Sequence, residues 1–99
     1  MWIQTQNKQR VINSDQIIDI FVDRSGTKIM AETVIDTNSH FALGEYKNRD
    51  ICIEVLEYVA IATYSDLPVL PMPLGGEVNT WIEGISKIVA NSIVSNFVG

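Results

Sequence analysis

The sequence contains a single cysteine, Cys52, and a single histidine, His40, which lie in different predicted elements. One cysteine cannot form an intramolecular disulfide, and structural zinc sites normally take several cysteine or histidine ligands. We therefore expect no disulfide, no metal site and no other cofactor, and we interpret both residues as structural. The lone cysteine also favours a reducing, cytoplasmic location.

Basic residues are scarce. The chain has 7 lysines and arginines against 12 aspartates and glutamates, giving a net charge of -5, and the basic residues are scattered. Proteins that bind nucleic-acid backbones cluster basic side chains against the phosphates, so direct nucleic-acid binding is not expected. An acidic surface suits solubility, a basic protein partner or mimicry of nucleic acid.

Long hydrophobic runs are also missing. The least charged stretch, from about residue 65 to residue 99, is broken by acidic residues, prolines and a lysine, which is unlike a membrane span. The opening residues 1–8 show no basic leader followed by an apolar core, so we expect no secretory signal. The 99 residues, 46% of them hydrophobic, fit one domain.

What is present begins with strand patterns. Alternation and turn residues predict strands at residues 2–6, 10–13, 16–23, 28–36 and 40–46. Gly26 supplies the positive φ that a tight turn needs. The alternation puts these residues on shared faces: Ile18, Ile20 and Val22 in the third strand, and Ile29, Ala31, Thr33 and Ile35 in the fourth. Short polar turns between strands indicate an antiparallel meander.

Helical spacing follows. Asn48 and Asp50 mark the start of a helix over about residues 48–63, whose apolar stripe comprises Cys52, Val55, Leu56, Val59 and Ala62. Three prolines make residues 67–73 extended and confine them to a sheet edge or an arm. After a hinge at Gly75 and Gly76, a second helix is predicted from about residue 77 to residue 96.

These patterns predict an α+β fold. A bent antiparallel sheet, a meander of about five strands, carries one helix across a face, and a proline-rich arm leads to a C-terminal helix. Residues 1–74 form the sheet and helix domain. Residues 75–99 form a helix that either belongs to the same domain or serves oligomerisation.

Three segments carry a resemblance. They are Met1-Trp2-Ile3-x-Thr5-Gln6, Leu43-Gly44-Glu45-Tyr46-Lys47-Asn48 with the helix after it, and Leu70-Pro71-Met72-Pro73. Residues 1–73 resemble small uncharacterised proteins of Firmicutes and their phages or mobile elements, which open with a Trp-Ile-x-Ser-Gln-like strand, carry a Leu-Gly-x-Tyr turn into one helix and end on Met-Pro. The resemblance implies no known activity, and residues 75–99 depart from it.

Catalytic constellations are weak. Asp19, Asp23, Glu32 and Asp36 could meet across a hairpin and provide acid/base chemistry, but nearby basic residues could neutralise them, and a solvated sheet face is the preferred interpretation. The glycines match no phosphate-binding loop, and no nucleophile elbow occurs. We therefore expect that this protein is not an enzyme.

The helices offer more apolar surface than one sheet face needs. The candidate interface residues are Ile53, Tyr58, Ile61, Trp81, Ile82, Ile85, Ile88, Val89, Ile93 and Phe97. The second helix could pack within its own chain or dock on another copy or a partner.

The function we expect is a non-enzymatic protein-binding module, a phage or mobile-element accessory protein that binds itself as a dimer or a host protein. One alternative is a small acidic inhibitor of a host nucleic-acid-handling or defence enzyme, of the anti-CRISPR or anti-restriction type. A remote alternative is a small enzyme that uses the hairpin carboxylates.

Overall fold

The computed structural model describes residues 1–35 and 39–98, with side chains described as far as residue 91. Its elements in chain order are β1 (Trp2–Gln4), β2 (Val11–Asn13), the 3₁₀ turn η1 (Ser14–Gln16), β3 (Ile17–Val22), β4 (Lys28–Thr33), β5 (His40–Glu45), α1 (Arg49–Ala62), β6 (Val69–Pro71), the 3₁₀ turn η2 (Gly75–Glu77) and α2 (Val78–Val98). The α+β class is confirmed.

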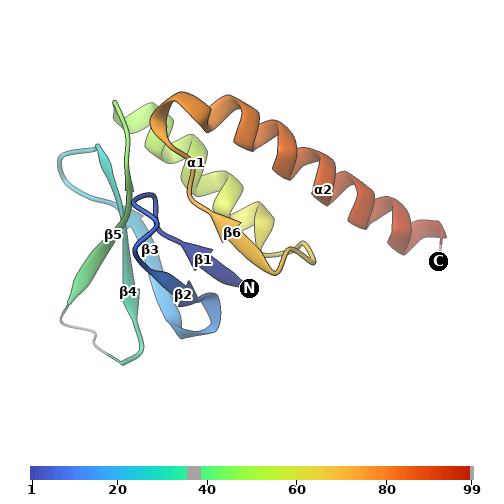
Figure 1. Cartoon of the computed structure of the whole chain (residues 1–99), viewed down its shortest axis with the longest axis horizontal. Helices are drawn as coiled ribbons and strands as arrows, with labels where there is room; N and C mark the ends of the chain where they lie inside the picture. The colour runs from blue at the N-terminus through green and yellow to red at the C-terminus, as the bar shows by residue number, and fades with distance from the viewer. Residues whose placement is uncertain (36–38, 99) are drawn as a thin grey trace.

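The strands form two sheets (Figure 1). The first sheet has the order β2-β1-β6, and the second has the order β3-β4-β5. The neighbours are antiparallel except β6, which runs parallel to β1. The predicted continuous meander is therefore interrupted after β2. The cause is η1, where the Asn13 side chain accepts a hydrogen bond from the Asp15 N–H at 3.0 Å and turns the chain into the second sheet.

The proline-containing arm is an edge strand, as its composition predicts. The Trp2 N–H donates to the Pro68 carbonyl at 2.9 Å, and the Met72 N–H donates to the Gln4 carbonyl at 2.9 Å. Proline has no N–H to give to a second neighbour, so a strand with Pro71 in it suits an edge. Leu70, in the middle of β6, is completely buried.

Two predicted face assignments are wrong. The register of β3 on β4 shifts between Ile17 and Asp19, which leaves Ile18 53% exposed and brings Ile17 onto the core beside Ile20. A bulge of this kind inserts one residue and breaks the alternation that the prediction assumed. The second error concerns Ile35, which is 84% exposed because β4 ends at Thr33.

The turn at Gly26 is confirmed. Gly26 has φ 78°, and its N–H donates to the Asp23 carbonyl at 3.0 Å. A side chain at this position would meet that of Arg49 at 3.2 Å. The β3–β4 hairpin thus needs a glycine for both backbone conformation and space.

Helix α1 also follows the prediction. The Asn48 side chain accepts from the Ile51 N–H at 2.9 Å and caps the helix, and the stripe of Cys52, Val55, Val59 and Ala62 is at most 1% exposed. This stripe packs against β3 and β4. It shares one core with the central residues of both sheets, which include Ile3, Ile29, Leu43 and Leu70.

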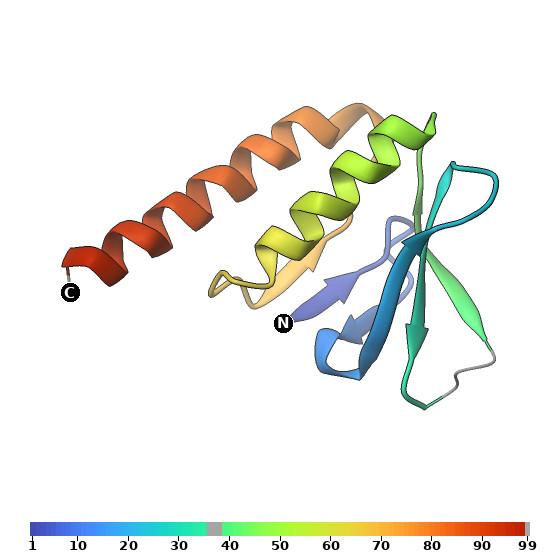
Figure 2. The same ribbon diagram turned by 180° about the vertical axis from the view of Figure 1, so that it is seen from behind.

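Helix α2 lies beside α1, and its C-terminal half continues past the end of α1 (Figures 1 and 2). Gly75 and Gly76 form η2, where the Glu77 N–H donates to the Leu74 carbonyl at 2.9 Å. Neither helix, over the residues that are described, combines the length and the hydropathy needed to cross a membrane.

Candidate interaction surfaces

The first candidate surface is the helical one that the sequence predicts. Ile85 is only 4% exposed, and Trp81, Ile82 and Val89 are partly buried against the core. On α1, Tyr58 and Ile61 are partly buried in the same way. Most of the surplus apolar area on the proximal part of α2 is therefore covered within the chain.

Trp81 shows how α2 is attached. Its indole Nε1–H donates to the Pro71 carbonyl at 2.7 Å, so the helix is bonded to the edge strand β6. Val78, one turn earlier, is 7% exposed. A partly buried indole that also satisfies its N–H is a strong anchor because the ring supplies apolar area and the N–H loses no hydrogen bond.

The remaining four predicted residues do not form one buried group. Ile53 is 49% exposed on α1. Ile88 is partly buried, and the side chains of Ile93 and Phe97 lie outside the described residues. At a rise of 1.5 Å per residue, the 21 residues of α2 span about 31 Å and the 14 of α1 span about 21 Å. The distal part of α2 is thus the portion of this surface without a long neighbouring helix (Figure 2).

The second candidate surface is the outer face of the first sheet. In this sheet Ile3 pairs with Ile12 and Leu70, and all three side chains are buried. Their neighbours in sequence must point to the opposite side. Among these neighbours are the polar Gln4 and Asn13, which are half-buried. The apolar ones form what we name the outer apolar face, and they are Trp2 (47% exposed), Val11 (53% exposed), Val69 (44% exposed) and the exposed Pro71.

A groove borders this face. It has a volume of about 440 Å³ and runs between β2 and the end of β4, with Trp2, Val11, Thr33 and Ile35 among its lining residues. Of the lining residues that the structure describes, Arg10 alone is charged. The Arg10 guanidinium carbon lies 4.2 Å from the centre of the Phe41 ring, a distance typical of a cation–π contact.

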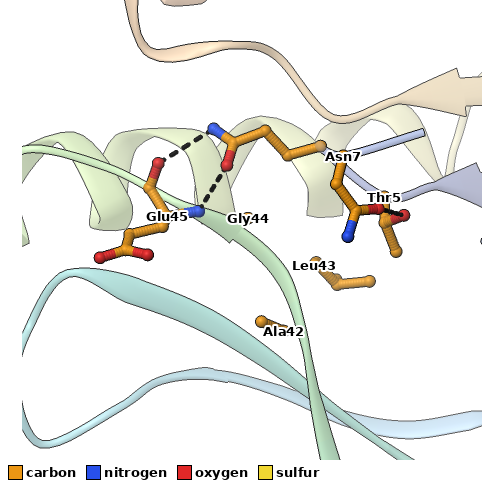
Figure 3. A pocket seen from close by; sticks show the side chains of 7 residues that line it. Thr5, Asn7, Ala42, Leu43, Gly44 and Glu45 are labelled. Carbon is orange, nitrogen blue, oxygen red and sulfur yellow. Dashed lines mark hydrogen bonds between the residues drawn. The ribbon is translucent and has the colours of Figure 1, made fainter. Parts of the chain in front are cut away.

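The junction between the sheets holds a smaller hollow of about 220 Å³ (Figure 3). The Gln6 side chain dominates it: Oε1 accepts from the Glu45 N–H at 2.9 Å, and Nε2 donates to the carbonyls of Glu45 at 2.9 Å and Pro73 at 3.1 Å. The amide imitates a peptide group of a neighbouring strand along the edge of β5. The polar atoms of the Gln6 side chain are thus already paired within the chain. We therefore interpret these residues as a structural junction between the sheets and not as a binding site.

The carboxylates predicted for the hairpin do not all meet at one place, as far as they are described. Asp19 and Glu32 are register partners in the second sheet, and Glu32 Oε2 lies 3.9 Å from His40 Nε2. Asp23 lies apart in the β3–β4 turn, and Asp36 is outside the described residues. Among the residues that are described, no three metal-binding side chains gather at one place.

Cys52 and Asp23 have shifted pKa values with clear causes. Burial raises the pKa of the Cys52 thiol, which is completely enclosed on the α1 stripe. A protonated, inaccessible thiol is a poor nucleophile. The pKa of Asp23 is lowered, chiefly by the Ser25 hydroxyl that donates to its carboxylate at 2.7 Å, and also by the N–H groups of Lys28 and Gly26.

Sequence reasoning missed the outer apolar face. The available signal was the alternation of residues 2–6: if Ile3 faces the core, Trp2 and Gln4 face outward. Val69 could not be assigned in this way because its outward direction follows from pairing with β1, across more than 60 residues of chain.

Comparison with known proteins gives no relative to which this chain can be assigned. It matches no protein-family model, and neither a curated protein nor a solved structure is significantly similar to it.

Proposed function

We propose that this protein is a non-enzymatic protein-binding module that acts in the cytoplasm as an accessory protein of a phage or mobile element. The observation that supports binding most directly is Trp2, which is 47% exposed on the central strand of the first sheet. Tryptophan is strongly enriched among residues that dominate binding energy, because it buries a large area and offers one hydrogen-bond donor.

The neighbours of Trp2 strengthen this argument. Val69 is its register partner on one side, and Val11 lies diagonally across on the other strand. A lone exposed apolar residue is ordinary on a protein surface, whereas a contiguous apolar patch around an aromatic side chain is typical of interaction sites. The outer apolar face is therefore the surface on which we place the principal partner.

The experiment compares two sets of outward substitutions. The face variant combines Trp2→Thr, Val11→Thr and Val69→Thr, and threonine keeps the β-branched shape that strands favour. The control variant combines Tyr64→Thr and Leu74→Thr, which replaces exposed apolar side chains outside both candidate surfaces (88% and 45% exposed). Affinity capture from host lysate with quantitative mass spectrometry should show a partner that the face variant loses at least tenfold and the control variant retains.

Equal capture by all three proteins, with circular dichroism showing each one folded, would show that the partner does not use the outer apolar face. Capture of no specific protein by the wild-type chain would contradict the proposed function itself. The two results are separable because the first needs a captured partner and the second has none.

Self-association is the second part of the proposal. The sequence continues the apolar spacing of α2 with Ile93 and Phe97, in the distal part that extends past α1 (Figure 1). A twofold pairing of two such segments would bury both stripes in one self-complementary contact. Sedimentation velocity over a range of concentrations should show a dimer for the wild type and for Thr80→Glu, and a monomer for Ile93→Glu. A wild-type monomer at every concentration would contradict the dimer.

One observation favours the alternative of an acidic inhibitor of a nucleic-acid-handling enzyme. Asp50, Glu54 and Glu57 are all exposed and recur at helical spacing along one side of α1. A row of carboxylates is the feature that a nucleic-acid mimic needs. If this alternative is right, Glu54→Gln with Glu57→Gln should weaken lysate capture of a nucleic-acid-binding enzyme more than the face variant does.

A further inference from the structure

We propose that the groove beside β2 binds an extended segment of the partner, which adds as a strand to the free edge of β2, seats an apolar side chain between Trp2 and Ile35 and places a carboxylate near Arg10. This inference rests on the proposed protein-binding function and names the chemistry of its partner. Three separate features support it: the backbone of β2, the apolar lining and the charge of the groove.

The backbone of β2 is the first feature. Thr5 N–H donates to the Arg10 carbonyl and Ser14 N–H donates to the Met1 carbonyl, each at 2.9 Å. In an antiparallel ladder, hydrogen-bonded pairs alternate with pairs whose groups point the other way. Ile12 therefore bonds to β1, while the N–H and C=O of Val11 and the N–H of Asn13 point away from it.

The edge formed by these groups is open. Within the described residues, β2 pairs with β1 alone, so no other strand takes up the outward groups of Val11 and Asn13. Exposed edges of this kind are templates for strand addition, in which the backbone supplies affinity and alternate side chains supply specificity. The groove along β2 is where an added strand would lie.

The lining is the second feature. Trp2 and Val11 belong to the outer apolar face, and Ile35 approaches from the end of β4 on the other side of the groove. All three are about half exposed or more in the free protein. A side chain of the added strand that pointed into the groove would contact all three and cover apolar area that is now in water.

The charge is the third feature. The protein as a whole carries -5, yet among the described residues that line the groove the only charged one is the cation Arg10. The contact with Phe41 holds the guanidinium beside the ring, and no carboxylate within the described residues forms an ion pair with it, so its N–H donors remain available for a carboxylate. An arginine held in this way suits bidentate binding of a carboxylate. A segment with an acidic side chain is therefore preferred to a basic one.

The test uses the full chain and begins with selection from a displayed library of random twelve-residue peptides. We expect enriched peptides to alternate apolar and polar residues and to share an acidic position. One enriched peptide is then synthesised as the probe, together with a version in which the acidic residue is replaced by its amide. The amide version should bind about tenfold more weakly, because a hydrogen bond to a charged group is lost.

Amide hydrogen exchange then locates the bound strand. In the free protein the Val11 and Asn13 amides should exchange rapidly, and at saturating peptide both should slow at least tenfold. The indole signal of Trp2 in a nitrogen–proton correlation spectrum should shift, whereas that of Trp81, bonded to Pro71, should not. Protection confined to α2 would overturn the inference.

Two variants separate backbone pairing from side-chain contact. Val11→Pro removes an outward N–H and none of the N–H groups that bond to β1, so the pairing of β2 with β1 is retained, but strand addition is blocked and peptide affinity should fall at least tenfold. Val11→Ala, the matched control, keeps the N–H and should lose only a few fold. Arg10→Gln should weaken binding about tenfold, while Arg24→Gln, an exposed arginine in the β3–β4 turn, should not change it.

Equal peptide affinity of the proline and alanine variants would overturn strand addition. Failure of the library to yield any peptide that competes for the groove would overturn the inference as a whole. If the face variant still loses its lysate partner in that case, the proposed function stands and only the extended-segment partner is wrong.

Discussion

The two sheets have similar apolar inner faces, but the side chains on their outer faces differ in polarity. In the second sheet the outside carries the charged or polar pairs Lys28 with Glu45 and Glu32 with His40, beside the partly buried apolar pair of Phe21 and Met30. In the first sheet the outside carries the exposed apolar residues Trp2, Val11 and Val69, beside the half-buried Gln4 and Asn13. Polar cross-strand pairs are stable on a solvent-exposed sheet face, whereas exposed apolar neighbours are typical of interaction sites. This difference between the outer faces is the reason why the proposed partner is placed on the first sheet.

The largest loss of stability is expected from a substitution at the centre of the second sheet. Ile29→Ala removes a completely buried side chain from β4 and should lower the free energy of unfolding by about 3 kcal/mol, because it leaves a cavity as well as losing apolar burial. Val69→Ala on the outer apolar face should cost less than about 1 kcal/mol. Urea unfolding followed by circular dichroism measures both. Similar losses for the two variants would show that Val69 is structural.

Gly44 tests the junction that joins the sheets. A Cβ at this position would lie 2.8 Å from the hydroxyl oxygen of Tyr46, a residue that is 4% exposed and donates to the Pro73 carbonyl at 2.9 Å. Gly44→Ala should therefore destabilise the fold by about 2 kcal/mol through overpacking. Gly84→Ala is the matched control, because a Cβ at this position would meet open space. This substitution should stabilise α2 by up to about 1 kcal/mol. Thermal unfolding midpoints that fall for both would contradict this explanation.

Substitutions in the turn of the β3–β4 hairpin should lower the stability less than Ile29→Ala or Gly44→Ala. Gly26→Val forces a β-branched residue into a φ of 78° and should cost about 1 kcal/mol or more. Gly26→Asn should cost less, because asparagine tolerates the left-handed region. Denaturation midpoints of the two variants against the wild type measure the difference. An asparagine variant as unstable as the valine variant would show that space beside Arg49, not backbone conformation, is limiting.

The sequence was sufficient for features that depend on neighbouring residues. Asn48 and the stripe after it predicted α1 almost to the residue, and Gly26 predicted its turn. The sequence was insufficient where distant segments decide. The parallel pairing of β6 on β1 joins Leu70 to Ile3, and no local pattern encodes such a partner. The bulge that exposes Ile18 likewise depends on how β3 fits β4.

The candidate surfaces follow the same division. Helical spacing correctly marked the apolar residues of α2, but only the packed structure shows that Trp81 and Ile85 are taken up by their own chain. Local alternation puts Trp2 and Ile3 on opposite faces of the strand. It does not show which of the two faces outward, and only the burial of Ile3 in the core decides this. A sequence therefore indicates which residues are apolar, while pairing decides which of them remain for a partner.

The smallest effect is expected from the carboxylate of Asp23, which organises the same turn as Gly26. Its pKa lies below the usual 3.8 in the folded protein, chiefly because the Ser25 hydroxyl donates to it. A carboxyl group with a lowered pKa in the folded state stabilises the protein above its unfolded pKa, and this contribution is lost as the pH falls through the folded value.

Asp23→Asn keeps an oxygen acceptor in the turn but removes the charge, so it separates the electrostatic part of this contribution from the geometry. At neutral pH the variant should unfold slightly more readily than the wild type, because hydrogen bonds to an ionised acceptor are the stronger ones. The gap between the two urea midpoints should stay constant above about pH 5 and close below the wild-type pKa, where both side chains are neutral. Asp66→Asn, at an exposed position after α1, controls for the loss of one negative charge. A gap that persists unchanged in acid would mean that the variant disturbs the shape of the turn and that the charge of Asp23 contributes nothing to the second sheet.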